Sequence, residues 1–444
     1  MNYFYKIITF LDIGLSYVRT EPLNYPTNTS FLNLMKVLIF YIFNFNSKKF
    51  VKVTTILLFF LIINILKVFY LPLIIIVYFS KYRFVQINYF QFGTTNLDLQ
   101  LMVRKNTNNG YKSIILIPNY SKFYYLKKIF KNLTIINNNF FNILLLPIKH
   151  SSLVSVKAEE VNIILFDSNL DFVEKNSYTN IINKGQNKIK ELFAFKERFN
   201  KEMKKLLKKN FSKFDLSKTI ILHHRENFYN KTSGMRGSDL KNYLPSIKYL
   251  LKKGFGVIRL SNTHSKKLIF KNIKYAEINI DEAINQLLQY YLISKCRGFI
   301  CTDSGPSVLG TMFNKPTYDT NIAGLNVAGV NSKSIFILKK VKLHNKFLTF
   351  NELIDLEYYK ALLYSRKADK LKLRLVQNTP EEILQVLKEF IGIKNHSKQT
   401  RKQKQFKNSL PDYIEMKHYK SNISKFFLKK NSAIFIDSFK AHNK

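Results

Sequence analysis

The alternation of apolar and polar positions predicts a chain of short buried strands separated by amphipathic helices. Short apolar runs bounded by Gly, Pro or polar residues are typical of strands, and the longer segments between them have the period of a helix. The predicted strands are residues 84–90, 113–118, 141–147, 219–224, 256–260 and 298–302. The predicted helices are residues 97–104, 191–209, 240–252, 283–295 and 353–391, the last with a start signal at Thr379 and Pro380.

Strands that alternate with helices of about a dozen residues predict parallel sheets joined by right-handed crossovers. Two such series, separated near residue 212, predict an α/β fold with two Rossmann-like doubly wound domains. The predicted divisions are an apolar helical region, an N-terminal Rossmann-like domain, a C-terminal Rossmann-like domain, and a region of helices with a basic tail: residues 1–82, 83–212, 213–345 and 346–444.

The most apolar stretch, residues 53–79, predicts contact with a membrane. As one helix it would be about 40 Å long, enough to cross a bilayer. Lys67 would be costly inside hydrocarbon, and Pro72 would kink or break the helix. Three interpretations therefore stay open: an interfacial or re-entrant anchor, a true span, and a buried core helix. Residues 31–45 are also apolar and could lie on the same surface.

Composition and charge narrow the class of protein. Hydrophobic residues make up 46% of the sequence and charged residues 23%, which excludes a wholly disordered chain. The net charge of +42 predicts attraction to phosphates, including those of an anionic membrane surface. The basic runs lack the interleaved aromatic pattern of RNA-binding modules, so nucleic acid is not an expected partner. Cys296 and Cys301 have no companions at zinc-site spacing and are expected to be buried thiols.

The loop that follows the predicted strand 298–302 has the residues of an anion site. Gly305 allows close backbone approach, and Pro306 suits the first turn of the helix that follows. Backbone amides at a helix start, at the carboxyl edge of a parallel sheet, attract phosphate groups. A diphosphate site is therefore predicted at Thr302, Asp303, Ser304, Gly305, Pro306 and Ser307. The alternative is a well-capped turn that binds nothing.

Three arginines are predicted to converge on the same edge of the sheet. Arg225 follows one predicted strand, Arg259 ends the next, and Arg236 precedes the helix between them. A guanidinium matches phosphate in a bidentate geometry, so the three are predicted to contact the diphosphate, the alternative for each being a surface ion pair.

The sequence carries no recognisable metal site. No Asp-x-Asp pair follows a predicted strand, so arginine and backbone amides, rather than a divalent ion, would neutralise a diphosphate leaving group. His223, His224 and His264 lack ligand partners at metal-binding spacing and are predicted to be packed or exposed histidines.

Several motifs, ordered between about residues 215 and 395, resemble a family of bacterial glycosyltransferases of the GT-B type, associated with surface-polysaccharide and lipopolysaccharide assembly. The motifs are residues 223–226 (His-His-Arg-Glu), 236–245, 253–260, 303–306 (Asp-Ser-Gly-Pro), 315–316, 320–321, 347–352 and 380–383. The His-x-Arg feature also looks like a phosphate-binding strand end of fucosyltransferases, and Asp-Ser-Gly-Pro like the donor loop of heptosyltransferases. The likeness weakens across residues 84–210 and is lost before them.

The resemblance implies a GT-B-like enzyme that transfers a sugar from a nucleotide-sugar donor, without a cofactor, to a glycan or lipid-linked acceptor. It places the donor nucleotide at Arg225 and residues 304–307, with Arg236 and Asn321 nearby. Such an enzyme is expected on the cytoplasmic side of the inner membrane, as a peripheral protein or on one N-terminal anchor.

One departure from the family concerns the acceptor side. Members tend to carry an Ile-Gly-His-like loop after the first strand, where this chain has Gly93, Thr94, Thr95 and Asn96. A histidine there cannot be the base, so Asp98 and Glu226 remain the candidate catalytic residues. Gly237 also stands where an Asn is common.

Two rival functions stay open. A nucleotide-sugar 2-epimerase shares the fold and an Asp-Ser-Gly loop, but usually continues with another Gly and an acidic pair, where this chain has Pro306 and Ser307. A non-catalytic polybasic protein that binds membranes or nucleic acid would show steep salt dependence and no need for Arg225.

Overall fold

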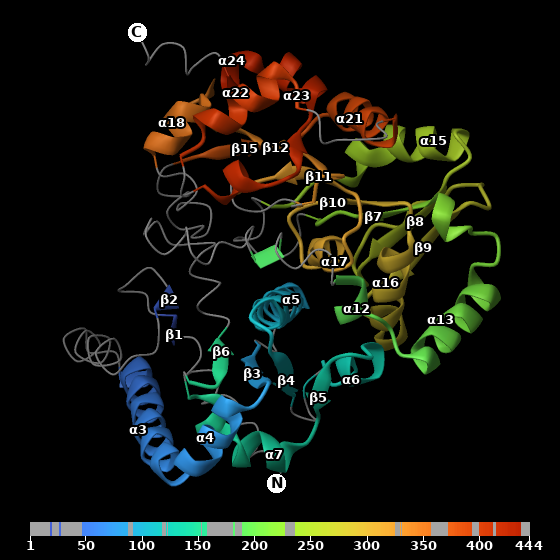
Figure 1. Cartoon of the computed structure of the whole chain (residues 1–444). Coiled ribbons are helices and arrows are strands. Elements are labelled where there is room, and N and C mark those ends of the chain that lie inside the picture. The colour runs from blue at the N-terminus through green and yellow to red at the C-terminus, as the bar shows by residue number, and fades with distance from the viewer. Residues whose placement is uncertain are drawn as a thin grey trace. The chain divides into compact units, whose positions relative to one another are not determined.

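The computed structural model forms two compact units, Met1–Lys196 and Glu197–Lys444 (Figure 1). The residues that the structure describes are 18–19, 26–27, 47–87, 92–117, 121, 123–151, 153–157, 181–182, 189–226, 236–324, 329, 331–356, 372–392, 399–411 and 414–436. Two buried residues of helix α13 (Glu197–Asn210), Phe199 and Met203, place that helix in the second unit, where the Phe199 ring lies 6.4 Å from the Tyr291 ring. The boundary therefore lies before this helix instead of near residue 212.

The second unit is built on one parallel sheet of seven strands. Its strands are β7 (Thr219–His223), β8 (Gly256–Ser261), β9 (Tyr275–Asn279), β10 (Gly298–Cys301), β11 (Thr317–Ile322), β12 (Ile335–Leu338) and β16 (Asn422–Ile423). Their order is β16-β12-β11-β10-β7-β8-β9, and every neighbouring pair is parallel. The chain thus starts at β7, winds outward to β9, and returns to β10 on the other side of β7. The prediction of an α/β chain with parallel sheets is confirmed, and the strand order is that of a doubly wound sheet.

Helices cover both faces of this sheet (Figure 1). Helices α15 (Leu244–Lys252) and α21 (Pro380–Gly392) pack on one face, and α16 (Ala283–Lys295) and α17 (Ser307–Met312) on the other. Glycines allow the closest approaches: a Cβ on Gly298 would lie 3.0 Å from the Phe390 ring, and one on Gly310 only 2.5 Å from Thr317. The sheet is therefore buried between two helical layers, as its continuous apolar strands require.

The C-terminal region differs from the predicted long helix over residues 353–391. Helix α18 (Phe350–Asp355) ends early, strand β15 (Arg374–Val376) pairs with β13 (Lys340–Leu343), and β13 pairs with β14 (Lys346–Phe347). The predicted helix start is correct, because the Thr379 hydroxyl accepts from the Glu382 N–H at 3.1 Å. Helices α22 (Arg401–Ser409), α23 (Lys425–Lys430) and α24 (Ser432–Phe435) follow, and β16 returns the chain to the main sheet.

The first unit has a smaller parallel sheet of order β5-β4-β3-β6. Its strands are β3 (Tyr82–Gln86), β4 (Lys112–Leu116), β5 (Thr134–Ile136) and β6 (Ser155–Lys157), and helix α5 (Phe92–Asn108) connects β3 to β4. A separate antiparallel pair joins β1 (Val18–Arg19) and β2 (Pro26–Thr27). Short helices α6 (Leu126–Ile129) and α12 (Ile189–Leu192) lie farther along the chain.

The predicted strand at residues 141–147 is wrong. This segment forms α7 (Asn139–Leu144) and α8 (Leu146–Lys149). The Asn138 side chain caps α7 by accepting from the N–H groups of Phe140 and Phe141, and Pro147 lies in the first turn of α8. A short apolar run has no periodicity that separates a strand from a buried helix, and these two local start signals decide for the helix.

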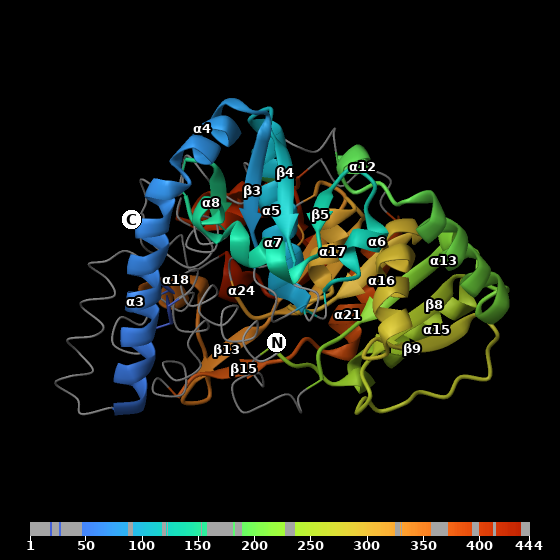
Figure 2. The ribbon, with the colours of Figure 1, turned by 90° about the horizontal axis from the view of Figure 1, so that it is seen from below.

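The apolar stretch near the N-terminus forms two helices, α3 (Ser47–Phe69) and α4 (Leu71–Phe79), which are bent by 73° (Figure 2). Pro72 in the first turn of α4 accounts for the break, because proline removes a backbone donor. Within the described residues, neither helix alone is long and apolar enough to cross a membrane, although the bent pair together passes that test of length and composition. The interpretation as a buried core helix is wrong, since most of the large apolar residues from Leu58 to Phe79 are exposed.

Candidate anion-binding site of the second unit

The carboxyl ends of β7 and β10 lie side by side where the winding of the sheet reverses. His223 and Cys301, the last residues of these strands, are register partners. One step farther, the Arg225 N–H donates to the Thr302 hydroxyl at 2.9 Å. Ligands of doubly wound sheets bind at this kind of reversal point, and the predicted loop 302–307 starts there.

The loop itself is a tight turn into α17. The Ser304 hydroxyl donates to the Thr302 carbonyl at 3.1 Å, and the Ser304 carbonyl accepts from both the N–H and the hydroxyl of Ser307. In the described part of the chain, the N–H groups of Ser304 and Gly305 donate to no protein acceptor. The described part of the chain thus leaves two backbone N–H groups of the loop without a protein acceptor at the carboxyl edge of the sheet, and such groups at a helix start can bind an anion.

Positive side chains border this loop. Arg236, whose side chain is 44% exposed, lies with its guanidinium 3.4 Å from the Asp303 carboxylate. The Arg225 carbonyl accepts from the Ser238 N–H at 2.8 Å, which ties the segment that contains Arg236 to the end of β7. Of the three predicted arginines, Arg236 thus has its guanidinium next to Asp303, and Arg225 has its backbone N–H bound to Thr302.

Lys339 is a further cation at this site, which the sequence analysis did not identify. It follows β12 directly, its ammonium group donates to the Gly237 carbonyl, and the residue is buried. Burial lowers the pKa of Lys339 to about 8, against an opposing effect of the Asp303 charge. The signal that could have found it was the apolar run 335–338, whose last residue is followed by this lysine.

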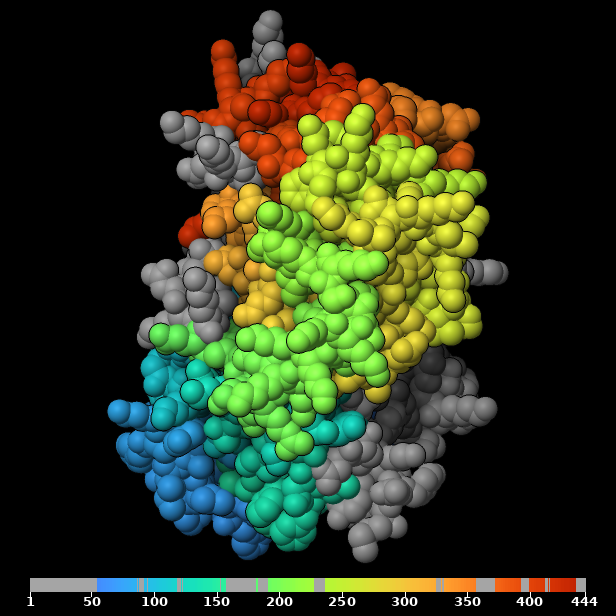
Figure 3. Space-filling model, turned by 90° about the vertical axis from the view of Figure 1, so that its right-hand side faces the viewer, coloured from blue at the N-terminus to red at the C-terminus, as the bar shows by residue number. Residues whose placement is uncertain are grey.

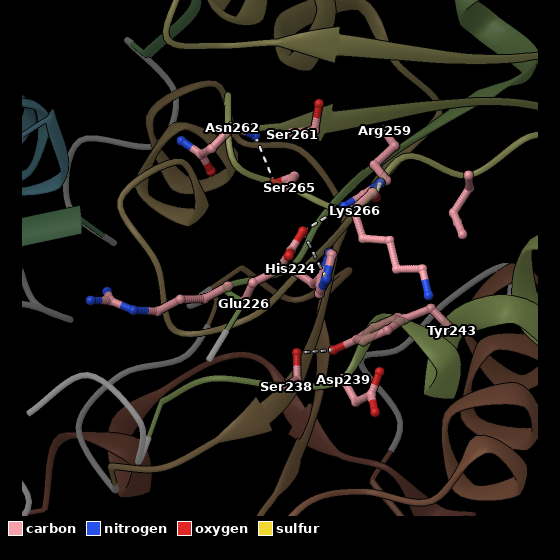
Figure 4. Close-up of polar contacts among 12 residues, drawn as sticks. His224, Glu226, Ser238, Asp239, Tyr243, Arg259, Ser261, Asn262, Ser265 and Lys266 are labelled. Atoms are coloured by element: carbon pink, nitrogen blue, oxygen red, sulfur yellow. Dashed lines mark hydrogen bonds and ion pairs between the residues drawn. The ribbon is translucent and has the colours of Figure 1, made fainter. Parts of the chain in front are cut away.

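Arg259, predicted to contact the diphosphate, forms buried ion pairs with two carboxylates. Its guanidinium is completely buried and lies 2.7 Å from Glu226, 2.7 Å from Glu277 and 2.7 Å from the Lys266 carbonyl (Figure 4). Glu226, a candidate base, is the partner of this buried arginine, and its carboxylate lies 3.7 Å from the His224 ring. The arrangement holds the strand ends of β7, β8 and β9 together.

The two histidines at the end of β7, predicted to be either packed or exposed, are both buried. The His223 Nδ1–H donates to the Leu260 carbonyl at 3.1 Å, and burial lowers the pKa of His223 to about 4. Burial also lowers the pKa of His224 well below its ordinary value, with the nearby Arg259 charge adding to the effect. Both rings are therefore neutral at pH 7 and add no positive charge to the site.

Asn321, which the resemblance places near the donor nucleotide, is hydrogen-bonded within the fold. It is buried with a left-handed backbone (φ 53°), and it exchanges two backbone-to-side-chain hydrogen bonds with Asn378, at 2.7 and 2.8 Å. Its amide also donates to the Tyr243 hydroxyl at 3.0 Å, and that hydroxyl lies 3.2 Å from Ser238 (Figure 4). These contacts fasten α21 and the start of the α15 region to β11.

The candidates on the acceptor side lie in the first unit. Gly93, Thr94, Thr95 and Asn96 are not a loop, because α5 begins at Phe92 and the Asn96 amide donates to the Phe92 carbonyl at 2.8 Å. Asp98 is a buried residue of the same helix. The role of Asp98 as a base stays a prediction, and the loop assignment is wrong.

Among the described residues, no group of three or more His, Cys, Asp or Glu side chains gathers as a metal site would require. Cys296 and Cys301 are buried free thiols, as predicted, and the Cys301 thiol donates to the Asp319 carboxylate at 3.0 Å.

Comparisons with known proteins give one structural likeness. No protein-family model and no curated protein matches the sequence. A solved structure of a glycosyl transferase of family 9 from Veillonella parvula aligns over 66% of this chain and 78% of its own, with 11% identity and a TM-score of 0.34. At that level of similarity the likeness carries no conclusion about this chain.

Proposed function

We propose that the second unit binds the diphosphate of a nucleotide sugar and that the protein is a glycosyltransferase of the GT-B type, which acts without a metal. The observation that carries this proposal is the hydrogen bond from the Arg225 N–H to the Thr302 hydroxyl, which joins Arg225 to loop 302–307 at the reversal point of the sheet. The motifs shared with bacterial glycosyltransferases fall on the same residues, 223–226 and 303–306.

The chemistry follows from the charges at this edge. In glycosyl transfer an acceptor hydroxyl attacks the anomeric carbon, its proton leaves to a base, and the bond from that carbon to the diphosphate oxygen breaks. The leaving diphosphate gains negative charge, which Arg225, Arg236 and Lys339 would neutralise together with the N–H groups of Ser304 and Gly305. The acceptor is proposed to be a cell-envelope glycan or glycolipid, and the transfer is proposed to take place at the cytoplasmic side of the inner membrane.

The donor site is tested by titration calorimetry of the full chain with UDP-, GDP-, ADP- and CMP-sugars. At least one is expected to bind, and Arg225→Ala and Arg236→Ala should each weaken binding roughly tenfold or more, as the loss of a charge-assisted contact predicts. Arg198→Ala is the matched control, since that arginine is 91% exposed and its partner among the described residues is Glu202, one helical turn away.

Binding of none of these sugars, or equal losses in the control and the two site variants, would refute the donor site. A nucleotide-sugar 2-epimerase is the second candidate, because its fold and loop are similar. Incubation of the donor without an acceptor separates the two, because only an epimerase would change the configuration at C2 of the sugar, whereas glycosyl transfer needs an acceptor hydroxyl.

A further inference from the structure

The bent helix pair of the first unit exposes an apolar surface to solvent. Helix α4 is apolar throughout, and six of its nine residues have exposed large side chains: Leu71, Leu73, Ile75, Ile76, Tyr78 and Phe79. The second half of α3, from Leu58 to Phe69, continues this surface. Blue atoms of this segment lie uncovered in the space-filling view (Figure 3). Monomeric soluble proteins rarely leave such a contiguous patch open.

Only a narrow seam of the pair is packed against its own unit. On α3, Ile56, Phe59 and Ile63 cluster with Leu146 of α8. On α4, Ile74 is buried in the core with Phe84 of β3, and Val77 packs beside it. The single charge between residues 54 and 79 is Lys67, whose ammonium donates to Asn64 one turn before it at 2.9 Å. Most of the other large side chains from Leu58 to Phe79 are apolar and exposed.

Basic and aromatic side chains border this surface. Lys81 and Tyr82 follow α4 and are exposed, and the Lys112 ammonium lies 5.8 Å from the Tyr82 ring. Arg83 fixes the end of α4 by donating to the carbonyls of Val77 and Tyr78. Tyrosine and lysine at the rim of an apolar surface are typical of the boundary between lipid headgroups and acyl chains.

The charge of the chain decides between a bilayer and a second copy of the protein. Two copies joined through this surface would bring their lysine rims together on chains that each carry +42, which is repulsive. An anionic bilayer instead offers opposite charge at the rim and hydrocarbon at the centre.

We propose that α4 and the second half of α3 insert together into the headgroup region of an anionic bilayer as a monotopic anchor. The 73° bend lets both helices lie along the surface, and α4 is about 13 Å long, too short to cross a bilayer. This anchor is independent of donor binding, because it uses residues of the first unit alone.

The experiment uses the absence of tryptophan from the chain. In full-length Phe79→Trp protein, the new indole replaces a side chain that is 82% exposed and becomes the single fluorophore of its kind. Vesicles of phosphatidylglycerol with phosphatidylcholine should shift its emission to the blue, and lipids brominated near the headgroup should quench it more than lipids brominated near the chain end. The control is Ile269→Trp in the second unit, 93% exposed, whose emission should not change.

A second variant measures the apolar contribution. Ile76→Asp places a charge in the middle of the surface at a residue that is 65% exposed, and it should lower vesicle binding at least tenfold, whereas Ile269→Asp should not. The proposal is overturned if the Phe79→Trp emission does not respond to anionic vesicles, if deep bromines quench it best, or if Ile76→Asp binds as the unmodified chain does. It is also overturned if light scattering shows a dimer that Ile76→Asp dissociates. Unchanged nucleotide-sugar binding in Ile76→Asp keeps this result separate from the donor-site test.

Discussion

Replacing Arg259 by methionine should destabilise the second unit strongly while leaving donor affinity nearly intact. The guanidinium is completely buried between Glu226 and Glu277, with each nitrogen-to-oxygen distance 2.7 Å, and it also donates to the Lys266 carbonyl. Methionine has a similar length but no charge, so the substitution removes all three contacts and leaves little empty space.

The expected loss of stability follows from the two carboxylates that remain buried without the arginine, those of Glu226 and Glu277. Removing one partner of a buried ion pair costs about 3–5 kcal/mol, because the remaining charge is left without compensation. Here two carboxylates remain, with side chains that are 11% and 16% exposed, so water can reach them in part. We therefore expect about 3 kcal/mol for Arg259→Met, near the lower limit. The triple variant Arg259→Met/Glu226→Gln/Glu277→Gln removes the uncompensated charges and should recover most of that loss.

Scanning calorimetry of the full chain is the assay, with the transition of the second unit assigned by its shift in Arg259→Met. For a unit of this size, about 3 kcal/mol corresponds to a fall in Tm of roughly 6–12 °C. Arg198→Met, an exposed arginine on α13, is the control and should stay within about 0.5 kcal/mol of the unmodified chain. Nucleotide-sugar affinity of folded Arg259→Met should change much less than that of Arg236→Ala.

Two results would refute this reasoning. If Arg259→Met is as stable as the unmodified chain, the buried ion pairs do not hold the strand ends. If it stays folded but loses donor binding as Arg236→Ala does, the original prediction of Arg259 as a donor contact was right.

Three further predictions concern Lys339, Gly310 and Asn321. Since burial lowers the pKa of Lys339 to about 8, the unfolded chain binds more protons than the folded one above that pH, and stability should rise between about pH 8 and 10.5. Donor affinity should fall over the same range as the ammonium loses its charge. Calorimetry on Lys339→Met should show a smaller rise in stability, with the remainder due to Lys407, whose pKa burial also lowers to about 8, and no matching fall in donor affinity. Gly310→Ala should destabilise by about 1–3 kcal/mol, measured as a lower Tm, because its Cβ would lie 2.5 Å from Thr317; an unchanged Tm would mean that α17 does not pack tightly on β11. Asn321→Ala should cost about 2–4 kcal/mol in thermal unfolding through lost hydrogen bonds and backbone strain, and selective loss of donor affinity without loss of stability would contradict its structural role.

Local patterns in the sequence were enough to locate the parallel strands of the second unit. Continuous apolar runs at residues 219–223 and 298–301 are strands because a sheet covered on both faces buries every side chain. The helix starts near Pro306 and at Thr379 were also predictable, since caps and prolines act within one turn. The same rules failed at residues 139–149, where an apolar run without period forms two short helices.

The sequence by itself therefore determined the α/β alternation and the turn at residues 302–307 that forms the candidate anion site, because both depend on residues that are neighbours along the chain. Only the tertiary structure decided which cations serve that loop. Arg259 is paired with Glu226, 33 residues away in the sequence, and lies in the core. Lys339 donates to the Gly237 carbonyl, 102 residues away, and lies beside the candidate site. Partners so distant in sequence leave no local pattern, and a charge's role depends on the partner that the folded chain places beside it.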